Sequence, residues 1–148
     1  MSEYPVIGHG PPTDAGGDRI RRGGCSCGAV RFEVRGEPLK VGICHCQECR
    51  KATGAVFVAY ADWRREAFSF TGASTEFRGR RFCPECGSRL FHLNEGKGLV
   101  EVMFGALDDA PTDLLPAVEG WTKRREPWLT PIQGLPQFQE DSREAPPN

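Results

Sequence analysis

Seven cysteines are the residues of this 148-residue chain whose type and spacing carry the clearest chemistry. Thiolate sulfur is a favoured ligand of zinc, and two cysteines in one tight loop can reach a single ion. An odd number of cysteines cannot pair completely as disulfides, so the count favours metal binding or catalysis over a disulfide framework. The cysteines form three groups: Cys25 and Cys27; Cys44, Cys46 and Cys49; Cys83 and Cys86.

The two outer groups supply four sulfurs, which is the number that a structural zinc site requires. Gly28 and Gly87 directly follow these groups. Glycine accepts positive φ there and lets backbone N–H groups point at the sulfurs. Buried free thiols and a redox C-x-x-C are the alternatives, although no βαβ pattern surrounds the second pair. We therefore predict a structural zinc with these ligands: Cys25, Cys27, Cys83 and Cys86.

The central group differs because Cys44, Cys46 and Cys49 supply three donors without an evident fourth of the same kind. Three protein ligands and an exchangeable fourth position are typical of a catalytic zinc. A thiol that binds there would be deprotonated by the metal. His45 lies between two of these cysteines, and we expect it to point away because neighbours on an extended chain face opposite ways. If His45 closed the site instead, the zinc would be structural.

Composition limits the classes of partner. Hydrophobic residues make up 39% of the chain and charged residues 26%, which is ordinary for a globular protein. No apolar run is long enough to cross a bilayer and no secretory signal is evident, so we expect a cytoplasmic protein without a membrane partner. The net charge of −1 argues against nucleic acid as a partner. Three basic clusters are interpreted as solvated surface, with a pocket for a small dianion as the alternative for one of them. They are Arg19, Arg21 and Arg22; Arg78, Arg80 and Arg81; and Lys123, Arg124 and Arg125.

The hydrophobic pattern predicts a mainly β chain with little helix. We expect one domain over residues 19–139 between mobile tails at 1–18 and 140–148. One short helix is expected over 46–53, stopped at Gly54, and a short turn over 111–115. Residues 75–78 are expected to pair with 68–71 as a hairpin that turns near Gly72, and a turn signal at 94–98 predicts a second hairpin. The predicted strands are 29–34, 41–44, 56–61, 68–71, 75–78, 89–93 and 99–104.

Three segments of the chain resemble the glutathione-dependent formaldehyde-activating enzymes and their relatives, including centromere protein V. These segments are residues 24–32, 44–54 and 81–91, with shorter matches at 105–109, 127–129 and 134–136. The resemblance runs from about residue 23 to 138. It implies a zinc-binding fold of the β-tent type, built from antiparallel sheets. It also implies a structural zinc on the outer cysteines and a second, more labile zinc on Cys44, Cys46 and Cys49, near where glutathione binds.

The activity that the resemblance implies is of the carbon–sulfur lyase type, in which glutathione and formaldehyde condense to S-hydroxymethylglutathione. Another thiol or a related aldehyde is an open alternative, as is a zinc-stabilised binding module without turnover. Arg50 and Lys51 are candidates to bind the carboxylates of glutathione, or they cap a short helix. The aromatic residues that could line a pocket or fill core are Phe57, Tyr60 and Trp121.

Overall fold

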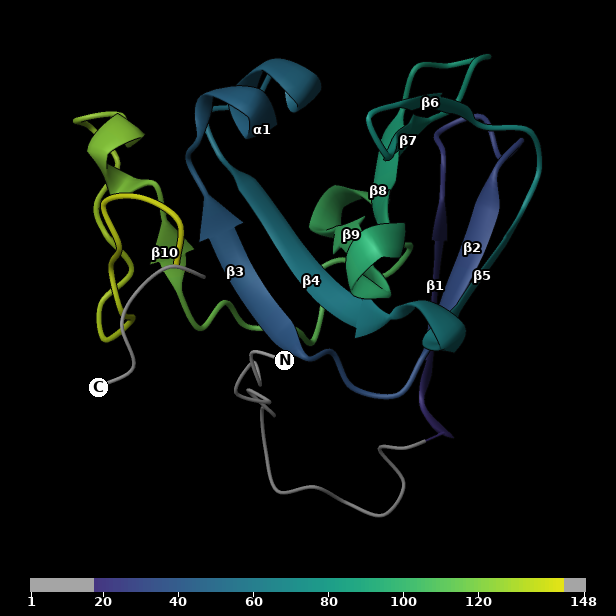
Figure 1. Cartoon of the computed structure of the whole chain (residues 1–148), viewed down its shortest axis with the longest axis horizontal. Coiled ribbons are helices and arrows are strands. Elements are labelled where there is room, and N and C mark those ends of the chain that lie inside the picture. The colour runs from purple at the N-terminus through teal and green to yellow at the C-terminus, as the bar shows by residue number, and fades with distance from the viewer. Residues whose placement is uncertain (1–17, 143–148) are drawn as a thin grey trace.

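The computed structural model describes residues 18–142; residues 1–17 and 143–148, which hold most of the two expected tails, lie outside the described residues. Two sheets make up this part of the chain (Figure 1). The smaller sheet has the order β1-β2-β5, and the larger has the order β10-β3-β4-β9-β8-β7-β6. All strand pairs are antiparallel except β10 with β3. A mainly β fold of antiparallel sheets with little helix is thus confirmed.

Short strands make up most of the regular structure, and the helical segments are brief. The strands are β1 (Ile20–Gly24), β2 (Arg31–Arg35), β3 (Lys40–Cys44), β4 (Val58–Arg64), β5 (Phe68–Thr71), β6 (Thr75–Phe77), β7 (Arg80–Phe82), β8 (Arg89–Asn94), β9 (Leu99–Met103) and β10 (Glu119–Gly120). The helix is α1 (Gln47–Thr53), and the 3₁₀ turns are η2 (Arg65–Ala67), η3 (Glu95–Lys97), η4 (Phe104–Ala106) and η5 (Thr122–Arg124).

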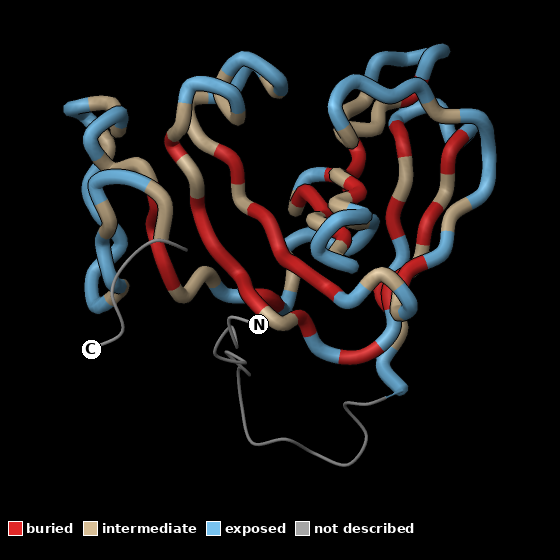
Figure 2. Tube along the Cα trace, in the orientation of Figure 1, coloured by how far each residue is buried: buried red, intermediate tan, exposed pale blue. Residues whose placement is uncertain are grey.

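The core lies between the two sheets. Val41, Ala61, Val102 and Phe91 are opposite one another on β3, β4, β9 and β8, and all four are fully buried. Phe91 meets aromatic rings of the smaller sheet, with its centroid 4.6 Å from that of Phe68. Burying a phenylalanine completely is worth about 1.5–3 kcal/mol. Figure 2 shows buried residues following β3 and β4 along most of their length.

Most of the predicted strands are confirmed within a few residues. The segment expected at 56–61 begins at Val58 and continues to Arg64. The second hairpin is confirmed, because β8 pairs with β9 across a turn that ends at left-handed Gly98. The helix expected over 46–53 is confirmed as α1, and it ends at left-handed Gly54, whose N–H donates to the Arg50 carbonyl (2.8 Å).

The hairpin predicted between 68–71 and 75–78 is wrong. β5 pairs with β2, whereas β6 pairs with β7 across the two residues Arg78 and Gly79. Both have positive φ, of 50° and 80°, as the tight primed turn of a two-residue hairpin requires. At Gly72 the chain instead leaves the smaller sheet, and an added Cβ there would lie 2.0 Å from the Ala29 carbonyl oxygen.

Three further differences concern segments with weak patterns. The turn expected over 111–115 is not helical. β1 was not predicted because Ile20 is the only large apolar residue of its five, yet it pairs with β2 over its whole length. β10 is only two residues long and is held by its neighbours.

Among the described residues, no helix is long and apolar enough to cross a membrane. The limits of the expected domain, 19–139, stay a prediction.

Candidate metal centres and the adjoining cleft

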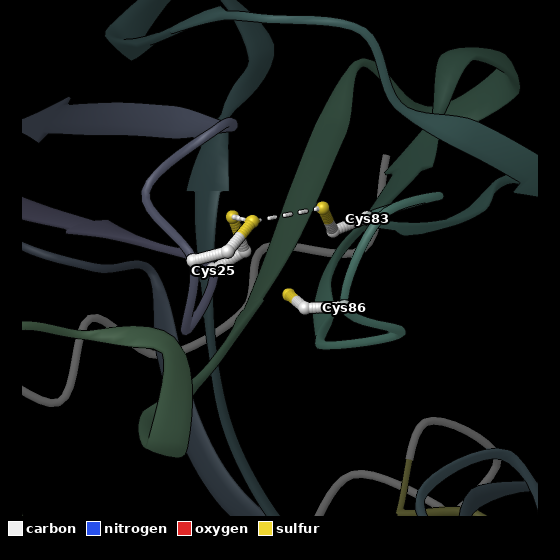
Figure 3. Close-up of side chains that lie close together, drawn as sticks. Cys25, Cys83 and Cys86 are labelled. Atoms are coloured by element: carbon white, nitrogen blue, oxygen red, sulfur yellow. Dashed lines mark hydrogen bonds between the residues drawn. The ribbon is translucent and has the colours of Figure 1, made fainter.

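The four outer cysteines come together between the two sheets. Cys25 and Cys27 lie in the turn from β1 to β2, and Cys83 and Cys86 lie in the turn from β7 to β8. Their sulfur atoms all lie within 4.8 Å of one another. In Figure 3 the sulfurs of Cys25, Cys83 and Cys86 turn toward one shared space. The group therefore joins the turn of the smaller sheet to that of the larger one.

The spacing of these sulfurs fits a tetrahedral zinc ion. Zinc–sulfur bonds of about 2.3 Å place neighbouring sulfurs about 3.8 Å apart. The Sγ atoms of Cys25 and Cys27 are 3.5 Å apart, and those of Cys27 and Cys83 are 3.7 Å apart. Val30 N–H donates to Cys25 Sγ (3.2 Å), which stabilises a thiolate. A metal ion would be held here by four protein ligands, which is the closed arrangement of a structural site.

The local backbone explains why each outer pair can form. Gly28 and Gly87 have φ of 82° and 75°, and an added Cβ would meet nothing, so their positive φ rather than space selects glycine. Gly28 N–H donates to the Cys25 carbonyl (3.1 Å) and Gly87 N–H to the Cys83 carbonyl (2.8 Å). Each turn thereby closes on its first cysteine, and the positive φ expected at the two glycines is confirmed.

The central cysteines, called the trio from this point, lie where β3 passes into α1. Cys44 ends β3, Cys46 is the N-cap of α1, and Cys49 lies in the first turn of the helix. Their sulfurs also lie within 4.8 Å of one another, and no other histidine, cysteine or carboxylate of residues 18–142 joins the group. Cys49 N–H donates to Cys46 Sγ (3.3 Å) and Cys46 N–H to Cys44 Sγ (3.5 Å). Three sulfurs, two of which accept from backbone N–H groups, fit a cation with three protein ligands.

The three thiols of the trio shift one another's pKa values. Hydrogen bonds from Cys44 and Cys49 lower the pKa of Cys46 to about 2. The pKa of Cys44 is raised to about 12, chiefly by its hydrogen bond with Cys46, and the pKa of Cys49 is raised by its hydrogen bonds with Cys44 and Cys46. One thiolate is thus favoured at Cys46, and further negative charge beside it is opposed. A bound cation would remove that opposition.

His45 does not join the trio. Its imidazole is buried, and its Nε2 donates to Glu119 Oε1 (3.1 Å). Glu119 also accepts from Gln137 Nε2 (2.6 Å) and from Ile132 N–H (2.9 Å), and it is paired with Arg125. Burial opposes ionisation of Glu119, but these hydrogen bonds and the arginine outweigh it, so the pKa of Glu119 is lowered. The contact holds β10 beside the loop that carries the trio.

A cleft of about 710 Å³ adjoins the trio, and all three of its cysteines line it. The trio wall comes from β3 and α1, the floor from the larger sheet, and the remaining wall from residues 120–124 and 141–142. The cationic residues of the lining are Arg80, Lys123 and Arg124. The lining also carries the carboxylates of Glu48, Glu101 and Asp141, so a small molecule with both anionic and cationic groups could lie beside the three sulfurs.

Two of the three predicted aromatic residues line this cleft. Tyr60 lies over Gly42, where an added Cβ would be 2.7 Å from the tyrosine hydroxyl. Trp121 has φ of 55°, and Lys123 Nζ lies 5.0 Å from its ring centroid. A bulky side chain at positive φ costs about 1–3 kcal/mol, and such strain collects at functional sites. Phe57 packs on His45 instead and is not part of the lining.

Arg50 and Lys51 do not line the cleft. Arg50 donates to Glu126 Oε1 (2.6 Å) and to the carbonyl of Arg124 (3.2 Å), so it ties α1 to the segment that forms one cleft wall. Lys51 is exposed near the end of α1. The carboxylate-binding role predicted for both residues stays a prediction.

Sequence reasoning placed Arg80 in a basic cluster but did not single out His92 and Glu101, which lie beside it on the floor of the cleft. Its polar residues include Arg80, His92 and Glu101, which come from β7, β8 and β9. His92 and Glu101 alternate with core residues along their strands, so the period of two could have placed them on the face opposite the core. That pattern alone does not say that this face adjoins the cysteines.

Known proteins resemble this chain. The family model of glutathione-dependent formaldehyde-activating enzymes matches residues 20–124. An uncharacterized lyase of Schizosaccharomyces pombe is 31% identical over 109 residues, covering 60% of this chain and 80% of that protein. The crystal structure of a Rhodobacter sphaeroides protein is 25% identical, covers 64% of this chain and 97% of that chain, and has a TM-score of 0.46.

Proposed function

The chain belongs to the family of glutathione-dependent formaldehyde-activating enzymes, and on that premise we propose that it is a zinc-dependent enzyme of the carbon–sulfur lyase type. It condenses glutathione, or another thiol, with formaldehyde or a related aldehyde to an S-hydroxymethyl adduct. The similarity to the uncharacterized lyase of Schizosaccharomyces pombe supports the class of reaction.

The observation that carries this proposal is the position of the trio in the wall of the cleft. Cys44, Cys46 and Cys49 offer three sulfurs to one ion, and no further histidine, cysteine or carboxylate of residues 18–142 joins them. Zinc bound there would supply a Lewis acid that takes an incoming sulfur as thiolate. The outer cysteines, by contrast, offer four sulfurs and are proposed to hold a structural zinc.

The residues around the trio suit a small thiol that carries several charged groups. Cations on the cleft wall attract the carboxylates of such a molecule and orient it, because charge-assisted hydrogen bonds are short and directional. Orientation matters here, since thiols and formaldehyde also combine without help, and an enzyme gains by placing sulfur beside the carbonyl carbon. Lys123 and Arg124 are suitably placed for this role. Arg50 and Lys51 could contribute only if their side chains reached the cleft from α1.

The test is the rate at which glutathione and its adduct interconvert at equilibrium, measured by magnetisation-transfer NMR with zinc-loaded protein. We expect the exchange rate to rise in proportion to protein concentration. Replacing Cys46 by Ser should abolish the increase and lower the zinc content from about two per chain to about one, with the fold retained.

The matched control is the same substitution in the other cluster. Cys27→Ser removes a ligand of the proposed structural site, so we expect loss of folded protein rather than selective loss of exchange. Wild-type protein that carries two zinc ions and yet leaves the exchange rate unchanged would contradict the enzyme proposal. A zinc-stabilised binding module without turnover would then be the better description.

A further inference from the structure

Five adjacent strands of the larger sheet each contribute one ionisable residue to a single transverse row. Lys40 is opposite Asp62, Asp62 is opposite Glu101, Glu101 is opposite His92, and His92 is opposite Arg80. Residues that are directly opposite on paired strands point to the same face of the sheet. The five side chains therefore form one polar row, which we call the floor row.

The floor row lies on the face of the sheet that turns away from the core. Each of its inner members is next in sequence to a fully buried apolar residue, as His92 is to Phe91 and Glu101 to Val102. Side chains alternate between faces, so the core takes one set and the opposite face takes the other. Asp62 and Glu101 place two carboxylates directly opposite each other on paired strands. Like charges in this arrangement destabilise a sheet, and proteins accept such a cost mainly at functional sites.

One end of the floor row lies in the cleft beside the trio. Arg80, His92 and Glu101 line the cleft together with the cysteines. Arg80 also donates to Glu48 Oε2 (2.7 Å) on α1, the helix that carries Cys49. The row is thus tied directly to the element that positions the sulfurs.

The imidazole of His92 has a defined place in this arrangement. It packs over Gly79, where an added Cβ would lie 2.6 Å from both Cδ2 and Nε2 of the ring. Gly79 is half of the β6–β7 turn, and its carbonyl accepts from Leu93 N–H (2.9 Å). Glycine at position 79 therefore leaves the space that the imidazole ring of His92 occupies.

We propose that His92, flanked by Glu101 and Arg80, is the residue that transfers the proton in the thiol–aldehyde addition, an inference that rests on the proposed function. In that addition the sulfur–carbon bond forms and the carbonyl π bond breaks. The electron pair of the π bond goes to oxygen, and the proton lost by the thiol is the proton gained by that oxygen. His92 accepts the proton and returns it, so the protein ends the cycle unchanged.

His92 suits this task better than its neighbours in the cleft. Histidine is the side chain that exchanges protons most readily near neutral pH, whereas a guanidinium keeps its proton. A carboxylate beside an imidazole orients the ring and stabilises the protonated form, the role that falls to Glu101. The other charged side chains that line the cleft are Glu48, Lys123, Arg124 and Asp141.

The test is His92→Ala with imidazole added back, using zinc-loaded full-length protein and the same exchange measurement by NMR. General acid–base catalysis contributes about a hundredfold or more to a rate, so the variant should lose most of the protein-dependent exchange. Imidazole should restore part of it, because removal of the ring leaves space over Gly79. Glutathione affinity, measured by calorimetry with glutathione alone, should stay at the wild-type value.

Glu101→Gln should lower the exchange rate without abolishing it, and the matched control Glu33→Gln, on β2 away from the cleft, should leave it unchanged. Full exchange activity in His92→Ala would overturn the inference. So would loss of activity that imidazole does not restore, or a parallel loss of glutathione binding. Absence of activity in the wild type would instead contradict the proposed function itself.

Discussion

Nε2 of His45 lies 3.1 Å from Oε1 of Glu119, and both side chains are almost fully buried. The two residues are 74 positions apart. Their contact joins the β3–α1 loop, which carries the trio, to β10, where the last part of the described chain returns beside β3. Gly120 is opposite Cys44 in this parallel pair, and His45 N–H donates to the Gly120 carbonyl (3.2 Å). The trio wall of the cleft thus depends on a buried polar contact behind it.

Replacing Glu119 should therefore destabilise the loop that carries the trio, and with it the folded protein. In Glu119→Ala, the buried imidazole of His45 loses its acceptor, as does Gln137, and we expect the free energy of unfolding to fall by about 3–5 kcal/mol. Urea unfolding measures this change. The control is Glu140→Ala, which breaks an exposed ion pair with Lys123 (2.5 Å) and should cost about 0–1 kcal/mol. Equal effects of the two substitutions would contradict the role assigned to Glu119.

The ion pair of Asp113 with Arg21 should make the free energy of unfolding depend on pH in the acid range. Arg21 is buried and donates to Asp113 Oδ2 (2.7 Å), and this hydrogen bond lowers the pKa of Asp113. A lowered pKa gives stability that is present above the unfolded value of about 3.9 and is lost as pH falls through the folded value. Asp113→Asn should cost about 1–2 kcal/mol at pH 7 and progressively less below about pH 4.

The free energies of unfolding of the wild type and of Asp113→Asn, measured across the acid range, give this difference in stability. The control is Asp108→Asn, since the pair of Asp108 with Arg31 is more exposed and should contribute about 0–1 kcal/mol. A difference between wild type and Asp113→Asn that stays constant from pH 7 to pH 3 would count against the assignment.

Chelation should remove metal in two steps. The trio lines the cleft, so a chelator can reach it, and it offers three sulfurs where the outer group offers four. The first equivalent of zinc should leave without loss of β structure, as followed by circular dichroism. Removal of the second should unfold the protein, because the outer cysteines join the two sheets. Release of both equivalents in a single step together with unfolding would show that the two groups are not distinct.

Gly79 should tolerate substitution poorly. Any L-residue at its φ of 80° costs about 1–2 kcal/mol. An added Cβ would also lie 2.7 Å from the Leu93 carbonyl oxygen and 2.6 Å from the His92 ring. Gly79→Ala should therefore destabilise the protein by more than Gly98→Ala, where φ is 63° and nothing lies within 4 Å of the added atom. Thermal unfolding of the two variants compares them directly.

Arg50→Ala separates a positioning role from a carboxylate-binding role. Loss of the contacts to Glu126 and the Arg124 carbonyl should free the 124–126 segment from α1. If Arg50 positions this cleft wall, calorimetric affinity should weaken for glutathione and for an uncharged thiol alike. Weakening for glutathione alone would show that Arg50 binds a carboxylate. Lys51→Ala, also on α1 but exposed, is the control.

Local features were predicted well from the sequence because they depend on near neighbours. The four-plus-three division of the cysteines follows from spacing within single turns. The helix that ends at Gly54 and the strands of alternating pattern depend on residues only a few positions apart. Gly28 and Gly87 marked the two cysteine turns for the same reason, since a positive φ is a requirement of the turn itself.

Only the tertiary structure decided which of these elements are neighbours. β6 joins β7 rather than β5 because the Arg78–Gly79 turn has the twist of a two-residue hairpin, while β5 pairs with β2. His92 and Glu101 become cleft residues because β7, β8 and β9 lie in one sheet whose other face is buried. The sequence alone determined how the cysteines divide into two groups. The pairing of distant strands determined what lies beside them, since such pairing depends on burial across the whole fold.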